Sequence, residues 1–244
     1  MAKKLLIVED DKNISFIISE NSKINGYDYD VAYDGQDGLN KALSNTYDLI
    51  ILDLMLPKMD GFAICKQIRQ EKILTPVIIL TAREDEADKI KGFELGADDY
   101  VTKPFGIKEF FARIRANIRR SSPESVLPDS NENIIKINSL VIDCEKSKVE
   151  KNNVLIELSR LEYDLLVFLA KNPDKIFPRE ELLKNVWKYD ISGGDDFYGD
   201  PRTVDVTIKR LRNKIEDDSS NPKIIQNRRG MGYYLTLTLT KNED

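Results

Sequence analysis

Hydrophobic residues in the first 120 positions gather in short runs that alternate with amphipathic stretches. The runs lie at 5–8, 29–33, 49–52, 77–80 and 99–101, and the stretches with helical spacing lie at 12–25, 35–46, 60–71, 84–95 and 106–120. Short apolar runs bounded by turn residues are typical of parallel strands buried on both faces. Five such repeats predict an α/β domain with a doubly wound, five-stranded parallel (βα)5 sheet, whose functional site lies at the carboxyl ends of the strands.

The pattern changes after residue 133. Residues 123–133 are rich in Ser, Pro and Asn and carry only acidic charges, which is typical of an exposed linker. Beyond them come strand-like runs at 134–137, 140–143, 148–150 and 154–158, helical patterns at 160–171, 179–187 and 202–216, and two more strand-like runs around a tight turn at 228–232. Strands and helices in separate blocks predict an α+β domain. We therefore expect one domain at 1–122 and a second at 134–244, joined by a linker at 123–133.

The composition excludes several kinds of chemistry. The 244 residues include no histidine, so the chain cannot form a Ser-His-Asp triad or a His-ligated zinc site, or act as a histidine phosphodonor. Cys65 and Cys144 lie outside any CxxC pattern, and no N-terminal apolar segment indicates secretion, so we expect two reduced thiols in the cytoplasm. No apolar run approaches the ~18 residues of a membrane span.

The formal net charge of −5 is unevenly distributed. Residues 1–122 hold 18 basic and 20 acidic side chains, the linker adds three acidic ones, and residues 134–244 hold 19 of each. Within that neutral domain, residues 202–234 hold eight basic and four acidic side chains. This local positive excess makes residues 202–234 a candidate nucleic-acid-binding surface.

Charged or hydroxyl side chains follow four of the predicted parallel strands. Glu9, Asp10 and Asp11 follow the first run, Asp53 the third, Thr81 the fourth and Lys103 the fifth. Because the carboxyl ends of parallel strands meet at one edge of a sheet, these groups should share a small volume. For any single acidic residue, capping of the next helix is the alternative.

The grouping suggests phosphoryl chemistry. Clustered carboxylates repel one another unless a cation offsets them, and an all-oxygen site favours a hard cation such as Mg²⁺. A carboxylate can also attack phosphorus and form an aspartyl phosphate. Lys103 would then pair with one phosphoryl oxygen, and the hydroxyl of Thr81 would donate to another.

These residues resemble the receiver domain of two-component response regulators. The resemblance is carried by Glu9-Asp10, Asp53-x-x-x-Pro57, Thr81-Ala82 and Lys103-Pro104-Phe105. It implies that Asp53 accepts a phosphoryl group from a sensor histidine kinase. It also implies that Asp10, Asp53 and the backbone carbonyl of Met55 ligate Mg²⁺, with Glu9 acting directly or through water.

The same resemblance implies a cis Lys103–Pro104 peptide and a switch between two arrangements. In this switch Thr81 moves toward the phosphoryl group and Tyr100 follows it inward. The residues alone leave a second interpretation open, in which Tyr100 is an ordinary half-buried aromatic side chain.

Residues 86–96 and 98–120 are similar to the OmpR/PhoB subfamily, which implies a homodimer formed on activation. By motif position, Lys89 would pair with Glu109 and Asp99 with Arg113 across a two-fold axis, around exposed Ile90, Phe93 and Phe111. The alternative is a solvated charged face around core aromatics. Single exposed ion pairs contribute roughly 0–1 kcal/mol, so we expect them to set orientation more than affinity.

The stretch 202–216 has the pattern of an amphipathic basic helix. Val204, Ile208, Leu211 and Ile215 recur at helical spacing and predict a buried stripe. The other faces are left to Arg202, Thr203, Val206, Thr207, Lys209, Arg210 and Arg212. Arg can read guanine edges, Thr or Val can meet a thymine methyl, and Lys suits phosphates. Taken alone, such a face is also typical of a solvated surface.

The segments RTVDV and RLR, followed by RRGMGYYL, resemble the winged-helix effector domain of the OmpR/PhoB family. This resemblance implies a recognition helix at 202–216, a hairpin wing at 228–232 with Arg229 in the minor groove, and Trp187 near the DNA backbone. Two departures stand out: Thr207 replaces the family's usual His, and the loop at 188–201 is longer than usual. In this family that loop can contact RNA polymerase.

Together these patterns predict a cytoplasmic, phosphorylation-activated transcriptional regulator that binds paired half-sites of promoter DNA as a dimer. We expect no metabolic activity, only slow self-phosphorylation and self-dephosphorylation at Asp53. A phosphatase is one alternative, but such enzymes use a D-x-D pair, and Met55 occupies the place of the second acid. A constitutive DNA binder is the other, and it fits poorly because every expected phosphorylation residue is present.

Overall fold

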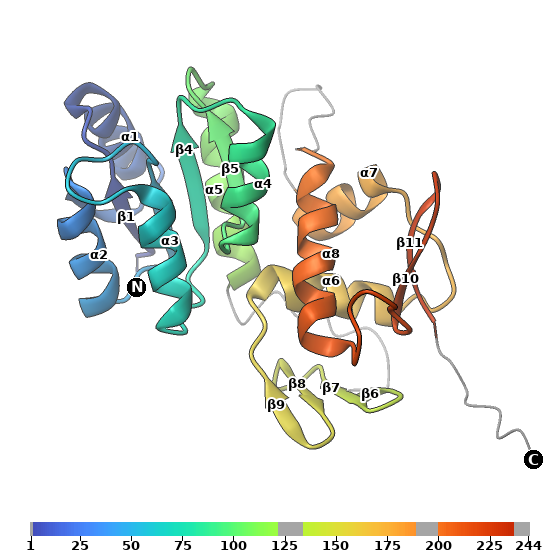
Figure 1. Ribbon diagram of the computed structural model, residues 1–244. Helices are drawn as coiled ribbons and strands as arrows, with labels where there is room; N and C mark the ends of the chain where they lie inside the picture. The colour runs from blue at the N-terminus through green and yellow to red at the C-terminus, as the bar shows by residue number, and fades with distance from the viewer. Residues whose placement is uncertain (1, 122–133, 189–199, 237–244) are drawn as a thin grey trace, which may run out of the picture. The chain divides into compact units, whose positions relative to one another are not determined.

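A computed structural model of the chain describes residues 2–121, 134–188 and 200–236 (Figure 1). The chain divides into two compact units, one ending at Ser121 and one that holds the described residues from Ile134 onward. Each unit has a hydrophobic core of its own, so each is described by itself.

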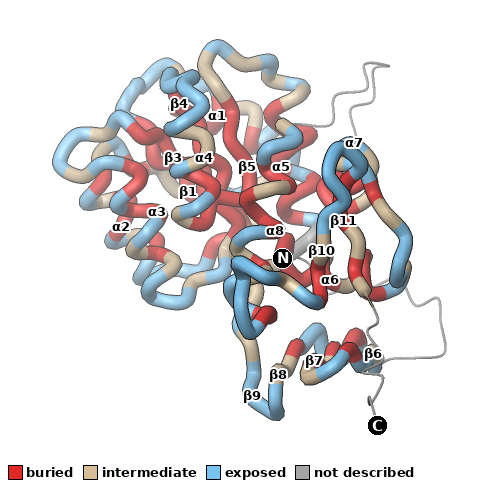
Figure 2. Tube along the Cα trace, turned by 45° about the vertical axis from the view of Figure 1, so that its right-hand side comes forward, coloured by how far each residue is buried: buried red, intermediate tan, exposed pale blue. Residues whose placement is uncertain are grey.

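The first unit is built on a parallel sheet with the strand order β2-β1-β3-β4-β5. The strands are β1 (Lys4–Val8), β2 (Asp28–Ala32), β3 (Leu49–Leu52), β4 (Val77–Thr81) and β5 (Asp99–Thr102). All of β3 and β4 is buried, and the buried strands run through the middle of the unit in Figure 2. This is the doubly wound sheet that the continuous apolar runs predicted.

Five helices cover the two faces of this sheet. They are α1 (Lys12–Ile24), α2 (Gly35–Ser44), α3 (Gly61–Gln70), α4 (Glu86–Glu94) and α5 (Ile107–Ser121). Ile18 of α1 and Phe110 of α5 share a core with alternate residues of β1, β3 and β4, so these two helices cover one face. Gly92 of α4 lies against Ile79, whose side chain points to the opposite face.

The second unit combines sheets and helices in blocks. An antiparallel sheet contains β6 (Ile134–Ile137), β7 (Leu140–Asp143), β8 (Lys148–Lys151) and β9 (Val154–Ile156). The helices are α6 (Arg160–Ala170), α7 (Arg179–Leu182), the π-helical turn η2 (Leu183–Trp187) and α8 (Arg202–Ile215), and the hairpin consists of β10 (Ile225–Arg228) and β11 (Gly232–Leu235). This arrangement confirms the predicted α+β class, consistent with a winged helix.

The predicted buried stripe of α8 is confirmed, because Val204, Ile208, Leu211 and Ile215 are all 0–1% exposed and belong to the core of the second unit. Most element bounds differ from the expected ones by at most two residues. The last strand-like run, expected at 232–240, is a strand over Gly232–Leu235, and residues 237–240 lie outside the described residues. The predicted helix 179–187 differs in character, since it ends as the π-helical turn η2. The linker at 123–133 and most of the loop at 188–201 lie outside the described residues.

Cys65 and Cys144 carry thiols and form no disulfide, as expected, and both side chains are buried. Within the described ranges, no helix combines the length and apolar character that crossing a bilayer requires.

The hairpin turn depends on two glycines in the left-handed region. Gly230 has φ +74° with open space around it, whereas Gly232 has φ +132° and a Cβ built there would lie 2.0 Å from the carbonyl oxygen of Phe177. The contact is close because the backbones of Phe177 and Tyr233 exchange hydrogen bonds of 2.8 and 3.0 Å. The base of the hairpin therefore has no room for a side chain at Gly232.

These two glycines form a matched pair for a stability test. We predict that Gly230→Ala lowers the free energy of unfolding by only about 1–2 kcal/mol, the cost of a left-handed conformation. Gly232→Ala adds a backbone clash and should cost clearly more. Chemical denaturation of both variants measures the difference, and equal losses would contradict the close approach to Phe177.

Candidate functional site

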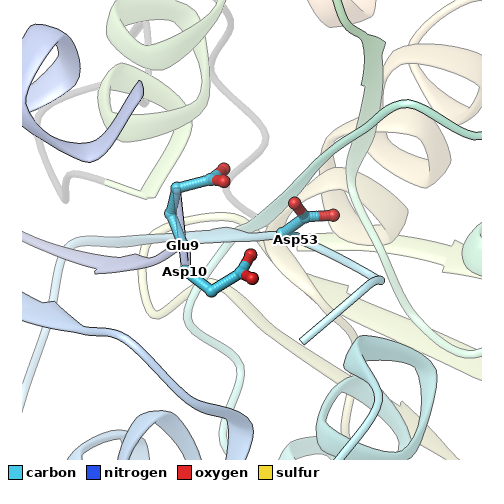
Figure 3. A group of neighbouring side chains, drawn as sticks. All are labelled: Glu9, Asp10 and Asp53. Carbon is cyan, nitrogen blue, oxygen red and sulfur yellow. The ribbon is translucent and has the colours of Figure 1, made fainter. Parts of the chain in front are cut away.

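Three carboxylates meet at the carboxyl ends of β1 and β3. Ligand oxygens of Glu9, Asp10 and Asp53 all lie within 4.8 Å of one another, and Figure 3 shows the three groups converging. Glu9 and Asp53 are buried, whereas Asp10 is exposed. The parallel sheet thus brings residues 44 positions apart into one acidic cluster, as the strand-end pattern predicted.

The ammonium group of Lys103 pairs with two of these carboxylates. Its Nζ lies 2.6 Å from Oδ2 of Asp53 and 2.8 and 2.7 Å from the two carboxylate oxygens of Glu9. Lys103 follows β5, and the Lys103–Pro104 peptide is cis, as the resemblance implied. Three carboxylates face one ammonium, so the acidic groups outnumber the cation that pairs with them.

Burial changes the proton affinities in this cluster. It raises the pKa of Glu9 to about 7, because the hydrogen bond and charge of Lys103 offset only part of the cost of burying a carboxylate and the charge of Asp53 adds to it. Burial alone would lower the pKa of Lys103, but hydrogen bonds to Asp53 and Glu9 outweigh it and raise that pKa. The ammonium therefore stays charged between its partners.

The neighbouring acid Asp11 has a different role. Its Oδ1 accepts hydrogen bonds from the backbone N–H groups of Asn13 (2.8 Å) and Ile14 (3.2 Å), so it caps the N-terminus of α1. The alternative explanation for strand-end acids is therefore correct for Asp11. Asp10 does not cap α1, and no hydrogen bond or ion pair engages its carboxylate within the described residues.

The donor set fits a hard divalent cation. Oxygen ligands without His or Cys, beside an exposed carboxylate that leaves room for water, suit Mg²⁺. The backbone N–H of Met55 donates to Oδ1 of Asp53 (3.1 Å), and this hydrogen bond helps to hold the Asp53 carboxylate in its orientation. The predicted ligand role of the Met55 carbonyl is not tested by this geometry.

The two predicted switch residues are joined through Arg83. The backbone N–H of Arg83 donates to Oγ1 of Thr81 (3.4 Å), and the hydroxyl of Tyr100 donates to the carbonyl of Arg83 (2.9 Å). Thr81 is fully buried and Tyr100 is 8% exposed. Burial raises the pKa of Tyr100, so its hydroxyl keeps its proton. The segment after β4 therefore contacts both side chains at once.

The predicted exposure of two aromatic residues on α4 and α5 is wrong. Phe93 and Phe111 are each 2% exposed. The ring of Phe93 packs 6.2 Å from that of Tyr100, and Phe111 packs edge-on against Phe110 in the core. Ile90 is half-buried. These aromatics stabilise the unit itself, which matches the alternative of a charged face around core aromatics.

Arg113 finds its partners within its own chain. Its guanidinium donates to Oδ1 of Asp99 (2.9 Å) and to Oε1 of Glu109 (2.8 Å), and both Arg113 and Asp99 are buried. The sequence assigned these groups to pairs across a two-fold axis. The internal pairs satisfy Arg113 in one chain, and the pairing of Lys89 with Glu109 remains a prediction.

On α8, three positions expected to face outward are buried. Thr203, Val206 and Thr207 are 2–7% exposed, and the hydroxyl of Thr207 donates to the carbonyl of Thr203 one turn earlier (2.7 Å). Their predicted exposure is therefore wrong, and the hydroxyl of Thr207 is already satisfied by its own helix. Arg202 and Lys209 on this helix, and Arg229 in the hairpin turn, are exposed.

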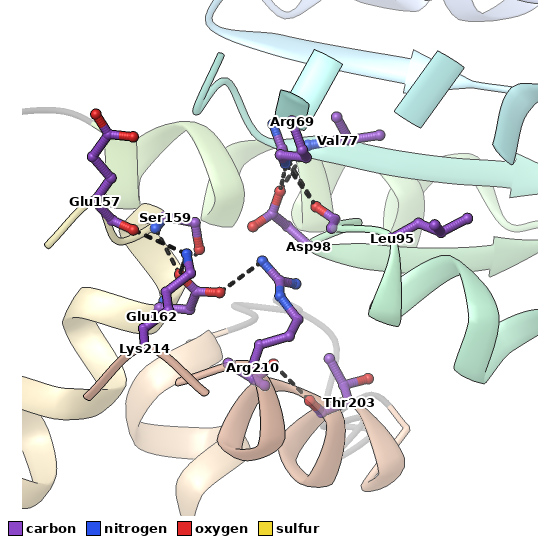
Figure 4. Close-up of polar contacts among 12 residues, drawn as sticks. Arg69, Val77, Leu95, Asp98, Glu157, Ser159, Glu162, Thr203, Arg210 and Lys214 are labelled. Carbon is purple, nitrogen blue, oxygen red and sulfur yellow. Dashed lines mark hydrogen bonds and ion pairs between the residues drawn. The ribbon is translucent and has the colours of Figure 1, made fainter. Parts of the chain in front are cut away.

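Arg210 lies beside a buried acid that the sequence analysis missed. Its guanidinium is 2.9 Å from Oε1 of Glu162, which is 0% exposed, and Nζ of Lys214 is 2.7 Å from the other carboxylate oxygen (Figure 4). The S-x-x-E motif from Ser159 could have located Glu162, since it forms a capping box at the start of α6. Figure 4 also shows the ion pair between Arg69 and the buried Asp98 of the first unit (2.9 Å).

Two further candidates for DNA contact point inward. Trp187 is fully buried in the core of the second unit, and its expected place near the DNA backbone remains a prediction. Arg212 is half-buried, and its Nε donates to the carbonyl of Ile225 in β10 (2.9 Å). Helical spacing does not show that Trp187 has apolar neighbours or that Arg212 lies next to the hairpin, because both depend on contacts between elements distant in sequence.

Comparison with known proteins identifies both units. The response regulator receiver domain family matches residues 5–115, and the family of C-terminal domains of transcriptional regulatory proteins matches residues 152–235. The response regulator DrrB of Thermotoga maritima, an OmpR/PhoB homologue, is 36% identical over 97% of this chain and 100% of its own, with a TM-score of 0.50. A serine-for-cysteine mutant of RitR is 29% identical over the same shares, with a TM-score of 0.74.

These two domains define a two-component response regulator that acts as a transcription factor. The chain belongs to the OmpR/PhoB family of response regulators. Its receiver domain implies a histidine kinase as phosphodonor, and its C-terminal domain implies DNA binding.

The adjacent acids Asp10 and Asp11 allow a matched test of the metal site. We predict that Asp10→Ala weakens Mg²⁺ binding at least about tenfold, or roughly 1.4 kcal/mol, with little change in stability. Asp11→Ala should instead lower the free energy of unfolding by about 1 kcal/mol, the usual value of an N-cap, and keep Mg²⁺ affinity. Isothermal titration with Mg²⁺ and denaturation measure the two effects, and the opposite assignment would refute the role given to Asp10.

Proposed function

We propose that Asp53 accepts the phosphoryl group from a sensor histidine kinase. The observation that carries this proposal is the pairing of Asp53 with the ammonium of Lys103 at 2.6 Å in a buried acidic cluster. A carboxylate oxygen of Asp53 attacks phosphorus, the bond from phosphorus to the donor's imidazole nitrogen breaks, and the electron pair leaves with that nitrogen. Lys103 then pairs with an oxygen of the aspartyl phosphate.

The remaining residues of the cluster would hold Mg²⁺. Glu9, Asp10, Asp53 and the carbonyl of Met55 would be its ligands, and the ion would supply the positive charge that the phosphoryl oxygens need. The hydroxyl of Thr81 would donate to a phosphoryl oxygen. To reach that oxygen, Thr81 would move toward the phosphoryl group. Because the backbone N–H of Arg83 donates to Thr81, the segment after β4 would move with it. Tyr100 would follow, because its hydroxyl donates to the carbonyl of Arg83.

We also propose that this movement favours a homodimer through α4 and α5. With Phe93 and Phe111 in the core, the apolar contribution of this face is reduced to residues such as Ile90, and charged groups such as Lys89 and Glu109 form the rest. Exposed ion pairs are weak individually. We therefore expect weak dimerisation whose main effect is to orient two effector domains on paired half-sites.

For the second unit, we propose that α8 and the hairpin bind promoter DNA. The support is the group of exposed cations at Arg202, Lys209 and Arg229, on the helix and in the turn of a winged-helix domain. Lys209 would contact phosphate and Arg229 the minor groove. The expected contact of the loop at 188–201 with RNA polymerase falls almost entirely outside the described residues and remains a prediction.

A phosphatase is disfavoured by the position two residues after Asp53. Met55 there is 50% exposed and offers no acid to protonate a leaving group. We therefore expect Asp53 to lose its phosphoryl group slowly to water, which sets the duration of the signal rather than a metabolic flux.

Phosphorylation should raise DNA affinity through Asp53 alone. We predict that acetyl phosphate with Mg²⁺ increases the affinity of the full chain for a DNA duplex enriched from a random library, and shifts sedimentation toward a dimer. The increase should be about tenfold, the range of a typical coupling free energy.

Two variants serve as controls for this experiment. Asp53→Ala should show neither response to acetyl phosphate, whereas Asp60→Ala, which removes the acid that caps α3, should keep both. Equal DNA affinity of the wild type with and without acetyl phosphate would favour the constitutive binder. Repeated turnover of a phosphomonoester would favour the phosphatase.

A further inference from the structure

Three side chains of α8 and its C-cap are bonded to the hairpin. Oδ1 of Asp205 accepts from the hydroxyl of Tyr233 in β11 (2.8 Å), and Nε of Arg212 donates to the carbonyl of Ile225 in β10 (2.9 Å). The carboxylate of Glu216, which directly follows α8, accepts from the backbone N–H groups at 223–225 (2.9–3.1 Å). Both strands of the hairpin are therefore tied to the helix.

The contact at Asp205 is part of a larger cluster. Nε of Arg179 in α7 donates to the same Oδ1 (2.6 Å), and the guanidinium groups of Arg179 and Arg212 lie 5.2 and 5.7 Å from the ring centre of Tyr233. These are cation–π distances. Burial, together with Asp205, raises the pKa of Tyr233 to about 12, so its hydroxyl remains a donor.

The contact at Glu216 is almost sealed from water. Glu216 is 8% exposed, and a buried carboxylate is costly unless hydrogen bonds satisfy it. Four hydrogen bonds from consecutive backbone N–H groups do so and fix where β10 begins. Because β10 leads into the turn that holds Arg229, its starting point sets the position of that turn.

The geometry points to Asp205, Arg212 and Glu216 as positioning residues for DNA recognition. We propose that they hold the hairpin, and with it Arg229, at a fixed distance from α8, so that the DNA affinity supplied by Arg229 depends on the Tyr233–Asp205 hydrogen bond. This inference rests on the proposed DNA contact of Arg229. It replaces the expected DNA contact of Arg212 with a role inside the protein.

The hairpin contains a matched control for this hydrogen bond. The hydroxyl of the next residue, Tyr234, donates to Oε1 of Gln226 (2.8 Å), which lies in the hairpin itself. Tyr234→Phe and Tyr233→Phe each remove one hydroxyl and keep the ring. Only Tyr233→Phe removes a bond between the hairpin and α8.

A double-mutant cycle tests the inference on the full chain, treated with acetyl phosphate and Mg²⁺ and bound to a DNA duplex enriched from a random library by the wild type. We expect Arg229→Ala to weaken binding roughly tenfold in the wild type and in Tyr234→Phe. In Tyr233→Phe, the same change should cost less than about threefold, since a displaced Arg229 has little contact to lose.

A second pair of variants separates positioning from folding. Asp205→Asn keeps an acceptor oxygen for Tyr233 and should retain the full effect of Arg229→Ala, whereas Asp205→Ala should reduce it as Tyr233→Phe does. A folding defect alone would not make the effect of Arg229→Ala depend on this acceptor. If Arg229→Ala weakens DNA binding by the same factor in every background, the positioning role is overturned, while the DNA contact of Arg229 is retained. No loss on Arg229→Ala in the wild type would overturn both.

Discussion

The ammonium of Lys103 is the group on which the receiver site depends. Three carboxylates from two strands share one small volume, and two of them are nearly sealed from water, so without a cation they would repel one another and take up protons. Lys103 reaches Glu9 and Asp53 at 2.6–2.8 Å and offsets part of their negative charge in a buried setting. The three carboxylates outnumber this one cation, and the negative charge that is left favours the binding of a divalent cation.

The effector unit uses buried acids for a different purpose. Glu162 forms ion pairs with Arg210 and Lys214, and Glu216 accepts hydrogen bonds from backbone N–H groups at the start of the hairpin. Arg210 and Lys214 of α8 are thus bound within the protein, whereas Lys209 of the same helix and Arg229 of the hairpin turn are exposed. A net positive segment in the sequence can therefore include basic side chains that stabilise the fold as well as exposed ones.

Topology explains why the sequence predicted so much of the receiver. Parallel strands align their carboxyl ends, so Asp53, Thr81 and Lys103 could be grouped from their places after apolar runs. The errors concern side-chain surroundings. Phe93 and Phe111 were expected to be exposed and are buried, because Phe93 packs against Tyr100 of β5 and Phe111 joins the core built on β1, β3 and β4. The pairing of Arg210 with Glu162 spans 48 positions, and helical spacing holds no information about such contacts.

The most direct measurement locates the phosphoryl group itself. The protein is incubated with acetyl phosphate and Mg²⁺, and its proteolytic peptides are analysed by mass spectrometry. The account predicts one phosphoryl group, on the peptide that holds Asp53, formed only with Mg²⁺ and much more slowly in Lys103→Met. A phosphoryl group on another acidic residue, or the same rate without the ammonium of Lys103, would contradict it.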